Sequence, residues 1–216
     1  MVWRYFRRRA QADAAYGAHL EERRGEGAPF DADIWVHAVS LGEMKSAEPL
    51  VTMCLEAGYR VVTTHATPAG RRAAEGVFAQ AIEAGQLAVR YAPVDLASFW
   101  NSFFRSHRPR VGLVMEMEFW PAMIEAARRT ECVLCLSNSQ VPGKSYARAQ
   151  RMARVFGHPI ARAAAVFAKS EPMADRFRML GAKNVHVMGE TRFDIASPSG
   201  HVAAGANLKD ARPVLT

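Results

Sequence analysis

The sequence has 216 residues, half of them hydrophobic, which is enough for one large domain or two small ones with a sizeable core. Lys and Arg number 28 against 21 Asp and Glu, and the net charge of +7 favours an anionic partner: nucleic acid, an acidic lipid surface or a phosphorylated substrate. No stretch approaches the roughly 18 consecutive apolar residues of a membrane-spanning helix, and the N-terminus lacks the apolar core of a signal peptide. A protein built from membrane-spanning helices is therefore excluded.

Residues 1–33 form a basic N-terminal arm. A helix is expected over about residues 10–24, because three helix-breaking residues follow it: Gly25, Gly27 and Pro29. The first nine residues place aromatic side chains beside arginines, which suits binding to an anionic membrane surface. A solvated basic arm, or one paired with Glu21 and Glu22, explains the same pattern equally well.

From Ile34 onward, short apolar runs alternate with longer amphipathic segments. The expected strands are residues 34–39, 60–64, 87–91, 111–115, 132–136, 164–168 and 185–188. The expected helices are residues 44–57, 69–81, 96–107, 121–130, 145–156 and 172–180. This alternation predicts an α/β fold with a parallel sheet, helices on both faces and right-handed crossovers. The domain runs over residues 34–194, and residues 195–216 have the composition of a linker that leads into another strand.

An acid stands where the first strand gives way to a helix. After the apolar run come Ser40 and Gly42, small residues that allow a turn, and then Glu43 at the expected start of the helix. Ligands of open α/β sheets bind just outside the carboxyl ends of the strands, so Glu43 is the leading candidate for chemistry. The simpler alternative is a first-turn acid that the helix dipole favours.

Polar residues also follow the other strands. In a parallel sheet these strand ends share one edge, so we expect their side chains to line one cleft. Hydroxyls, amides and acids that pair with sugar hydroxyls, and a tryptophan that stacks on a ring face, suit a carbohydrate. Taken singly, each residue is also explained as a helix cap or a turn residue. The residues concerned include Ser40, Gly42, Thr67, Gly70, Asp95, Glu116, Glu118, Trp120, Asn138 and Lys169.

The stretch 115–121 carries the second acidic site. Glu116 and Glu118 face the same side if the strand continues, and two like charges there would repel each other. Alternatively, one acid caps the helix begun by Pro121 while the other binds a buried donor.

Several other chemistries lack their signatures. Cys132 and Cys135 have C-x-x-C spacing, but their apolar neighbours place them in a strand and no second cysteine pair completes a zinc site. The seven histidines show no metal-binding spacing, and no dinucleotide-binding or Walker loop occurs. Basic residues are scattered, so nucleic-acid binding is not expected. The sequence thus predicts no metal and no cofactor, and its few cysteines favour a reducing, cytoplasmic location.

Six short motifs occur in a characteristic order and spacing. They are residues 37–43 (HAVSLGE), 67–70 (TPAG), 91–95 (YAPVD), 116–121 (EMEFWP), 180–182 (LGA) and 189–194 (GETRFD). Together they resemble the Kdo transferases, the 3-deoxy-D-manno-octulosonic acid transferases of lipopolysaccharide synthesis, glycosyltransferase family 30. The resemblance extends over about residues 21–216.

The resemblance implies the N-terminal, acceptor-binding half of a GT-B glycosyltransferase, an enzyme of two Rossmann-like domains. Such enzymes transfer Kdo from CMP-Kdo to a lipid A precursor, with inversion and without a metal, as peripheral proteins at the cytoplasmic face of the inner membrane. The donor site is expected mainly in a C-terminal domain beyond this sequence.

The resemblance also implies roles for individual residues. Glu43 corresponds to the general base, and Glu116 and Glu118 to an acidic pair beside the acceptor. The further acceptor-binding residues are Ser40, Gly42, Thr67, Gly70, Trp120 and Asn138. The sequence departs from the usual family pattern at Ala122, at residues 139–144 and at Arg192. The alternative function is a non-catalytic module that binds an anionic glycolipid and has no donor domain.

Overall fold

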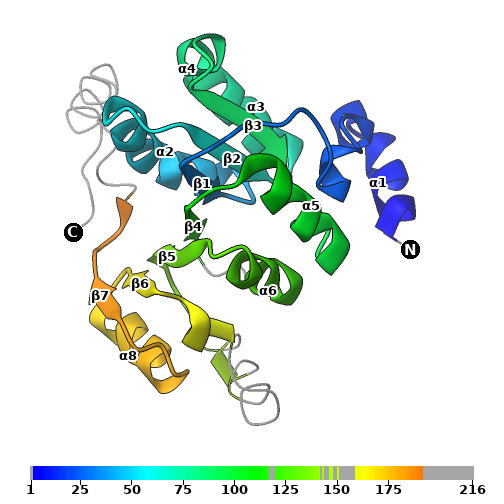
Figure 1. The fold of residues 1–216 in the computed structure, drawn as a ribbon. Helices are drawn as coiled ribbons and strands as arrows, with labels where there is room; N and C mark the ends of the chain where they lie inside the picture. Colours follow the sequence, from blue (N-terminus) through cyan, green and yellow to red (C-terminus); the bar gives the residue numbers. More distant parts are fainter. Residues whose placement is uncertain are drawn as a thin grey trace, which may run out of the picture.

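The fold is a single parallel sheet between two layers of helices (Figure 1). A computed structural model describes residues 2–116, 120–141, 143, 146, 147, 150 and 159–191. Within these ranges seven strands pair in the order β3-β2-β1-β4-β5-β6-β7, and every neighbouring pair is parallel. The strands are β1 Ile34–His37, β2 Val61–His65, β3 Leu87–Tyr91, β4 Val111–Met115, β5 Val133–Ser139, β6 Ala165–Ala168 and β7 Val185–Val187.

Helices connect the strands in the predicted alternation. They are α2 Leu41–Glu56, α3 Pro68–Val77, α4 Ala79–Glu83, α5 Ala97–His107, α6 Pro121–Arg129, the 3-10 helix η3 Pro159–Arg162 and α8 Glu171–Met179. The predicted strands and helices are confirmed to within a few residues, except that the segment predicted over 69–81 is divided between α3 and α4. The helix predicted over 145–156 and the linker at 195–216 lie largely or wholly outside the described residues.

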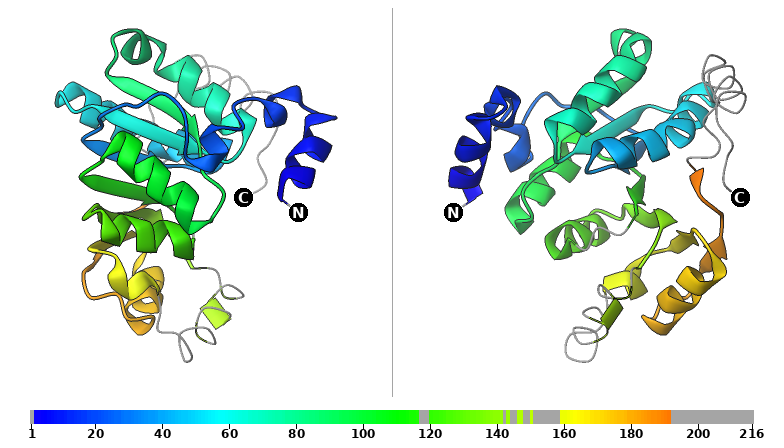
Figure 2. Two further views of the ribbon diagram at one scale, coloured as in Figure 1. Left: turned by 45° about the vertical axis from the view of Figure 1, so that its right-hand side comes forward. Right: turned by 180° about the vertical axis from the view of Figure 1, so that it is seen from behind.

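Both faces of the sheet are buried. On one face Trp35 of β1 packs against Trp100, Phe103 and Phe104 of α5, with ring centroids 5.4–5.6 Å apart. On the other face Val36, the next residue, joins a cluster with Met44 of α2. Successive side chains of a strand point to opposite faces, so an uninterrupted apolar strand requires helices on both sides. Figure 2 shows these two helical layers.

The N-terminal arm differs from its prediction. The α-helix is α1, Val2–Ala10, and residues 10–24 instead contain two short 3-10 helices, η1 Ala14–Gly17 and η2 Glu22–Arg24. Asp13 accepts a hydrogen bond from the backbone N–H of Ala15 (3.0 Å) and so caps a new short helix. His19 has a φ of +50°, which a continuous right-handed helix does not allow.

The arm is held against the body of the domain. At Gly25 a Cβ atom would lie 1.9 Å from the carbonyl oxygen of Phe99, so the chain passes α5 at a distance that only glycine permits. The acids considered as partners for the arm's first arginines bind elsewhere: Glu22 pairs with Arg71 of α3, and Glu21 lies 3.6 Å from His19. That pairing hypothesis is therefore wrong.

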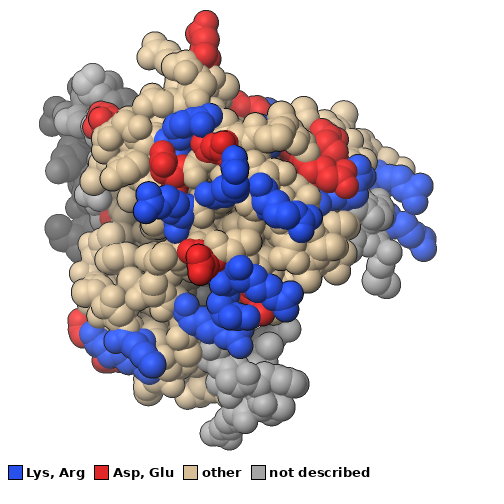
Figure 3. Space-filling view, viewed as in Figure 1, with Lys and Arg blue, Asp and Glu red and all other residues tan. Residues whose placement is uncertain are grey.

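Charged side chains are mixed on the face in Figure 3, where Lys and Arg lie among Asp and Glu. Glu125, for example, contacts Arg128, Arg129 and Arg162 at 2.9–3.0 Å. In the described ranges, no helix is both long and apolar enough to cross a membrane.

Three histidines, His37, His65 and His107, are buried. Burial lowers the pKa of His37 to about 3, and it lowers the pKa of His65 and of His107 to about 4. His65 Nδ1 lies 2.7 Å from the carbonyl oxygen of Ala38, and His107 Nδ1 lies 3.2 Å from that of Phe30. An unfolded chain would regain the ordinary histidine pKa of about 6.5.

These shifts predict acid sensitivity. Each folded pKa lies below the unfolded value, so the unfolded chain binds more protons, and stability present above pH 6.5 is lost as the pH falls toward 4. Each histidine contributes at most about 1.4 kcal/mol per pH unit. Urea unfolding at pH 7, 6 and 5 should show this decline, and His107→Gln, whose amide can still donate to Phe30, should reduce it. If the free energy of unfolding falls with pH as steeply in that variant as in the unchanged protein, His107 does not contribute to the acid sensitivity.

Candidate active site

The candidate site lies where the strand order reverses. The chain moves from β1 outward to β2 and β3, then returns to β4 on the other side of β1. His37 is level with Val114 in this parallel pair, and continuing that register places Val39 beside Glu116. Neighbouring strands are about 4.8 Å apart. Glu43, which follows β1, and Glu116, which follows β4, therefore flank the switch point at which α/β sheets bind ligands.

Glu43 is fixed at the start of α2 by a variant of the capping box, in which the acid reaches the N–H of the residue before the N-cap. The Ser40 hydroxyl accepts a hydrogen bond from the Glu43 backbone N–H at 3.4 Å. In return, Oε2 of Glu43 accepts from the Val39 N–H at 2.5 Å and Oε1 accepts from the Ser40 hydroxyl at 3.2 Å. The Ser-x-x-Glu spacing, which defines this motif, was already present in the sequence. Glu43 is 8% exposed and has an observed structural role; its role as a general base stays a prediction.

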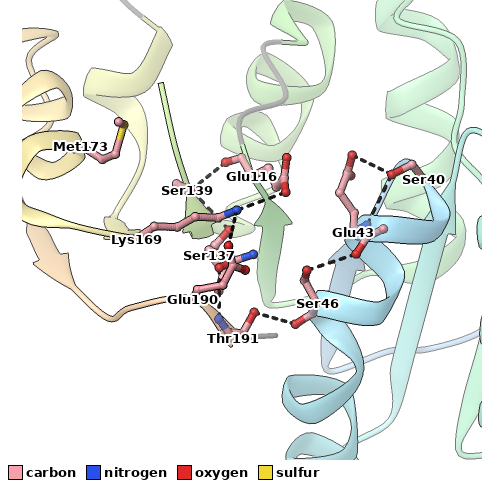
Figure 4. Close-up of polar contacts among 12 residues, drawn as sticks. Ser40, Glu43, Ser46, Glu116, Ser137, Ser139, Lys169, Met173, Glu190 and Thr191 are labelled. Carbon is pink, nitrogen blue, oxygen red and sulfur yellow. Dashed lines mark hydrogen bonds and ion pairs between the residues drawn. The ribbon is translucent and has the colours of Figure 1, made fainter. Parts of the chain in front are cut away.

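Lys169 joins two acids at the same edge. Its Nζ lies 3.3 Å from Glu116 and 2.9 Å from Glu190, and its side chain is 12% exposed. Lys169 follows β6 and Glu190 follows β7, so the ion pairs connect three strand ends. In Figure 4 Glu116 lies between Lys169 on one side and Ser40 and Glu43 on the other. Glu118 lies outside the described residues, and the neighbour observed for Glu116 is a cation.

The chain after β7 returns across the sheet edge to α2. Thr191 donates from its backbone N–H to the side-chain oxygen of Asn138 (3.3 Å) and from its hydroxyl to the Ser46 carbonyl (2.8 Å). Asn138 is fully buried, with a φ of +51°. Its side chain therefore joins β5 to the chain after β7, and its role in acceptor binding stays a prediction.

Three further predicted residues build the turn. The Thr67 hydroxyl caps α3 by accepting from the Gly70 N–H at 3.2 Å and contacts the Val39 carbonyl at 3.4 Å. A Cβ atom at Gly70 would lie 3.1 Å from the Ser40 carbonyl carbon, so glycine lets α3 approach the capping box. The Gly42 carbonyl accepts from the Ser46 hydroxyl at 3.1 Å.

A cleft of about 570 Å³ lies beside the capping box, between the arm and the strand ends. It is lined by Tyr5, Phe6, Arg9, Tyr16, Arg23, Val39, Ala66, Thr67, Ala92, Pro93, Val94, Asp95 and Trp120. Thr67, Asp95 and Trp120 thus line it as predicted. The other described members of the predicted set share the sheet edge but not this lining, so the expectation of one common cleft is only partly correct.

Asp95 has the capping role that the sequence analysis considered for Glu116 or Glu118. Its carboxylate accepts from the backbone N–H groups of Met123 (3.1 Å) and Ala122 (3.4 Å) at the start of α6. Burial raises the pKa of Asp95, and these two hydrogen bonds oppose the rise. The neighbouring Trp120 packs edge-to-face on His37, with ring centroids 5.0 Å apart.

The cysteine pair shows no sign of a metal site. Burial raises the pKa of Cys132 to about 12 and also raises that of Cys135, so both thiols stay protonated at neutral pH. Across the described ranges, no group of three or more His, Cys, Asp or Glu side chains is arranged to hold a metal ion.

The sequence profile of the family described as 3-deoxy-D-manno-octulosonic-acid transferase (kdotransferase) matches residues 11–195. The chain belongs to the Kdo transferase family. Curated relatives include the 3-deoxy-D-manno-octulosonic acid transferase of Bordetella pertussis, 34% identical over all of this chain and 52% of its own length. That of Haemophilus influenzae is 24% identical over 83% of this chain and 43% of its own. The chain thus spans about half the length of these relatives. This membership favours an enzyme over a non-catalytic module.

Solved structures support the Rossmann-like fold of this Kdo transferase family member. The UDP-GlcNAc 2-epimerase of Neisseria meningitidis bound to UDP-GlcNAc has a TM-score of 0.53 and 12% identity, over 82% of this chain and 49% of that one. The S. aureus MnaA–UDP co-structure has a TM-score of 0.52 and 13% identity, over 81% and 51%. Matches over half of each structure are as expected for one half of a GT-B fold.

The capping box can be tested through stability. Glu43→Ala should lower the free energy of unfolding by about 1 kcal/mol, because the carboxylate acceptors of the helix start are lost. Glu43→Gln should cost less, since its amide oxygen can still accept from the Val39 N–H. Urea denaturation measures both, with Glu56→Ala in the exposed last turn of α2 as the control. Equal losses for Ala and Gln would argue against the cap.

The Lys169 ion pairs make a second prediction. Lys169→Met should lower the free energy of unfolding at pH 7 by about 2 kcal/mol, because two carboxylates lose a charged hydrogen-bond donor. Lys169→Arg, which keeps the charge and the hydrogen-bond donors, should cost less than Lys169→Met. The matched control is Lys183→Met, an exposed lysine. Equal losses for Lys169→Arg and Lys169→Met would indicate a packing effect.

Proposed function

We propose that this chain supplies the acceptor-binding part of an enzyme that transfers Kdo from CMP-Kdo to a lipid A precursor. The family match supports the reaction, and the position of Glu43 beside Glu116 at the switch point supports the site. CMP-Kdo is a substrate in this proposal, and no metal or cofactor takes part. A part of the relatives that this chain does not match would supply most of the donor site.

Glu43 acts as the general base in this proposal. Oε1 removes the proton from the acceptor hydroxyl while the hydroxyl oxygen attacks the anomeric carbon of Kdo. The bond to the CMP phosphate breaks, CMP leaves with the electron pair, and the proton stays on Glu43 until solvent takes it. Oε2 keeps its hydrogen bond from the Val39 N–H during the step, so the base is held in place as it reacts.

The rest of the edge would position the acceptor. Trp120 and Thr67 line the cleft next to the base. Lys169 holds Glu116 and Glu190 in fixed positions at this edge, and carboxylates can accept hydrogen bonds from sugar hydroxyls.

The proposal includes a peripheral location at the cytoplasmic face of the inner membrane. Arg4, Arg7, Arg8 and Arg9 are exposed on α1, where they would bind anionic headgroups.

Glu43→Gln tests the base directly. The chain is joined to the part of the Bordetella pertussis relative that it does not match, and transfer from CMP-Kdo to a lipid A precursor is measured. The variant should lose at least about 100-fold in kcat, the usual range for a general base, while its fold is preserved. Glu56→Gln on the same helix serves as the matched control and should retain full activity. Near-normal turnover by Glu43→Gln would refute the assignment.

A further inference from the structure

One buried arginine lacks an acidic partner. Arg23 is 2% exposed, and its guanidinium lies between the rings of Phe6 (4.1 Å to the centroid) and Tyr91 (4.0 Å). One terminal nitrogen donates to the Ala66 carbonyl at 3.2 Å, while Nε has no hydrogen-bond partner. In the part of the chain that the structure describes, no carboxylate forms an ion pair with Arg23.

The adjacent acid is already engaged. The carboxylate of Glu22 pairs with Arg71 and also accepts from the Tyr91 backbone N–H at 2.7 Å. Arg71 has a second partner in Glu75, at 2.7 Å. A buried charge is costly unless it is paired. The two ring contacts, the Ala66 carbonyl and the nearby charge of Glu22 offset that cost in part, and no carboxylate in the described chain pairs directly with Arg23. Burial lowers the pKa of Arg23 only to about 10, so it remains charged at neutral pH.

Arg23 lines the 570 Å³ cleft beside the candidate active site, and Arg9 lines it as a second, exposed cation. The Arg9 guanidinium lies over Tyr16, 5.0 Å from the ring centroid. The carboxylate in the lining, that of Asp95, already binds two N–H groups of α6. The cleft therefore combines available positive charge with aromatic walls, and its volume is that of a small-ligand site.

We propose that Arg23 and Arg9 form an oxyanion subsite, which binds a phosphate or carboxylate group carried by a sugar. Aromatic side chains of the lining, Trp120 among them, contact the ring, and the guanidinium groups bind the anion by charge-assisted hydrogen bonds. The inference rests on the proposed function, because the anionic sugar would be part of the acceptor. It adds the location of the anionic group and the residues that select it.

Binding to the 216-residue chain tests the subsite. Calorimetric titrations use N-acetylglucosamine 1-phosphate, glucuronic acid, N-acetylglucosamine and inorganic phosphate. At least one anionic sugar should bind ten-fold or more tightly than the neutral sugar. Inorganic phosphate should bind more weakly than the sugar phosphate, because it lacks the ring. Comparing the two anionic sugars distinguishes a phosphate ligand from a carboxylate. Equal binding of neutral and anionic sugars would overturn the proposal.

Matched variants assign the effect to Arg23. Arg23→Met should weaken binding of the anionic sugar at least ten-fold and leave binding of the neutral sugar unchanged. Arg24→Met removes a partly exposed neighbour that is paired with Glu26, and it should change the binding of neither sugar. If Arg23→Met does not fold, the variants Arg9→Met and Arg23→Lys test the subsite in its place. Arg9→Met should weaken binding of the anionic sugar. Arg23→Lys should weaken that binding less than ten-fold, because the positive charge remains. Undiminished anion binding in a folded Arg23→Met or in Arg9→Met would contradict the subsite.

These outcomes are independent of catalysis. Binding without transfer in the joined enzyme would reject the proposed function and keep the subsite. Transfer by the joined enzyme, combined with equal binding of anionic and neutral sugars, would keep the proposed function and reject the subsite.

Discussion

The hydrogen bond from the Val39 N–H to the Glu43 carboxylate fixes the geometry of the whole site. It joins the end of β1 to the first turn of α2, at the strand where the sheet order reverses. Without a partner, this N–H would be a partly buried donor, and enclosed donors are costly to leave unsatisfied. The bond therefore holds the turn closed and sets the direction of the one acidic side chain in it. Every neighbouring residue at this edge is placed relative to that turn.

Two segments far apart in sequence close around the turn. From the N-terminal side, η2 packs against β3 and α5, so Arg23 reaches the ends of β2 and β3. From the other side, the chain after β7 crosses back to α2, where Thr191 binds Ser46 and Asn138. This return also brings Glu190 to Lys169, which already contacts Glu116. The edge is thus assembled from the start, middle and end of the described chain, and its electrostatics are a property of the tertiary fold.

The sequence predicted what depends on local pattern. Continuous apolar runs identified the strands, and Ser40 and Glu43 were placed correctly because a strand end followed by a cap is a local signal. The ion pairs of Lys169 and the capping of α6 by Asp95 join residues 21 to 53 positions apart, and no periodicity reports such contacts. The arm was misjudged for a related reason: residues 10–24 have helical composition, but Asp13 and the contact of the Tyr91 hydroxyl with Ala15 favour short turns. Glu118 lies outside the described residues, so the acidic pair of Glu116 and Glu118 beside the acceptor remains a prediction.

Capping and catalysis make different demands on the two oxygens of Glu43. Oε2 has the short bond to a backbone N–H, which cannot move without opening the turn. Oε1 has the longer contact to the Ser40 hydroxyl, which can rotate toward another acceptor when a substrate hydroxyl arrives. One carboxylate can therefore start the helix and serve the reaction, because the two tasks use different atoms.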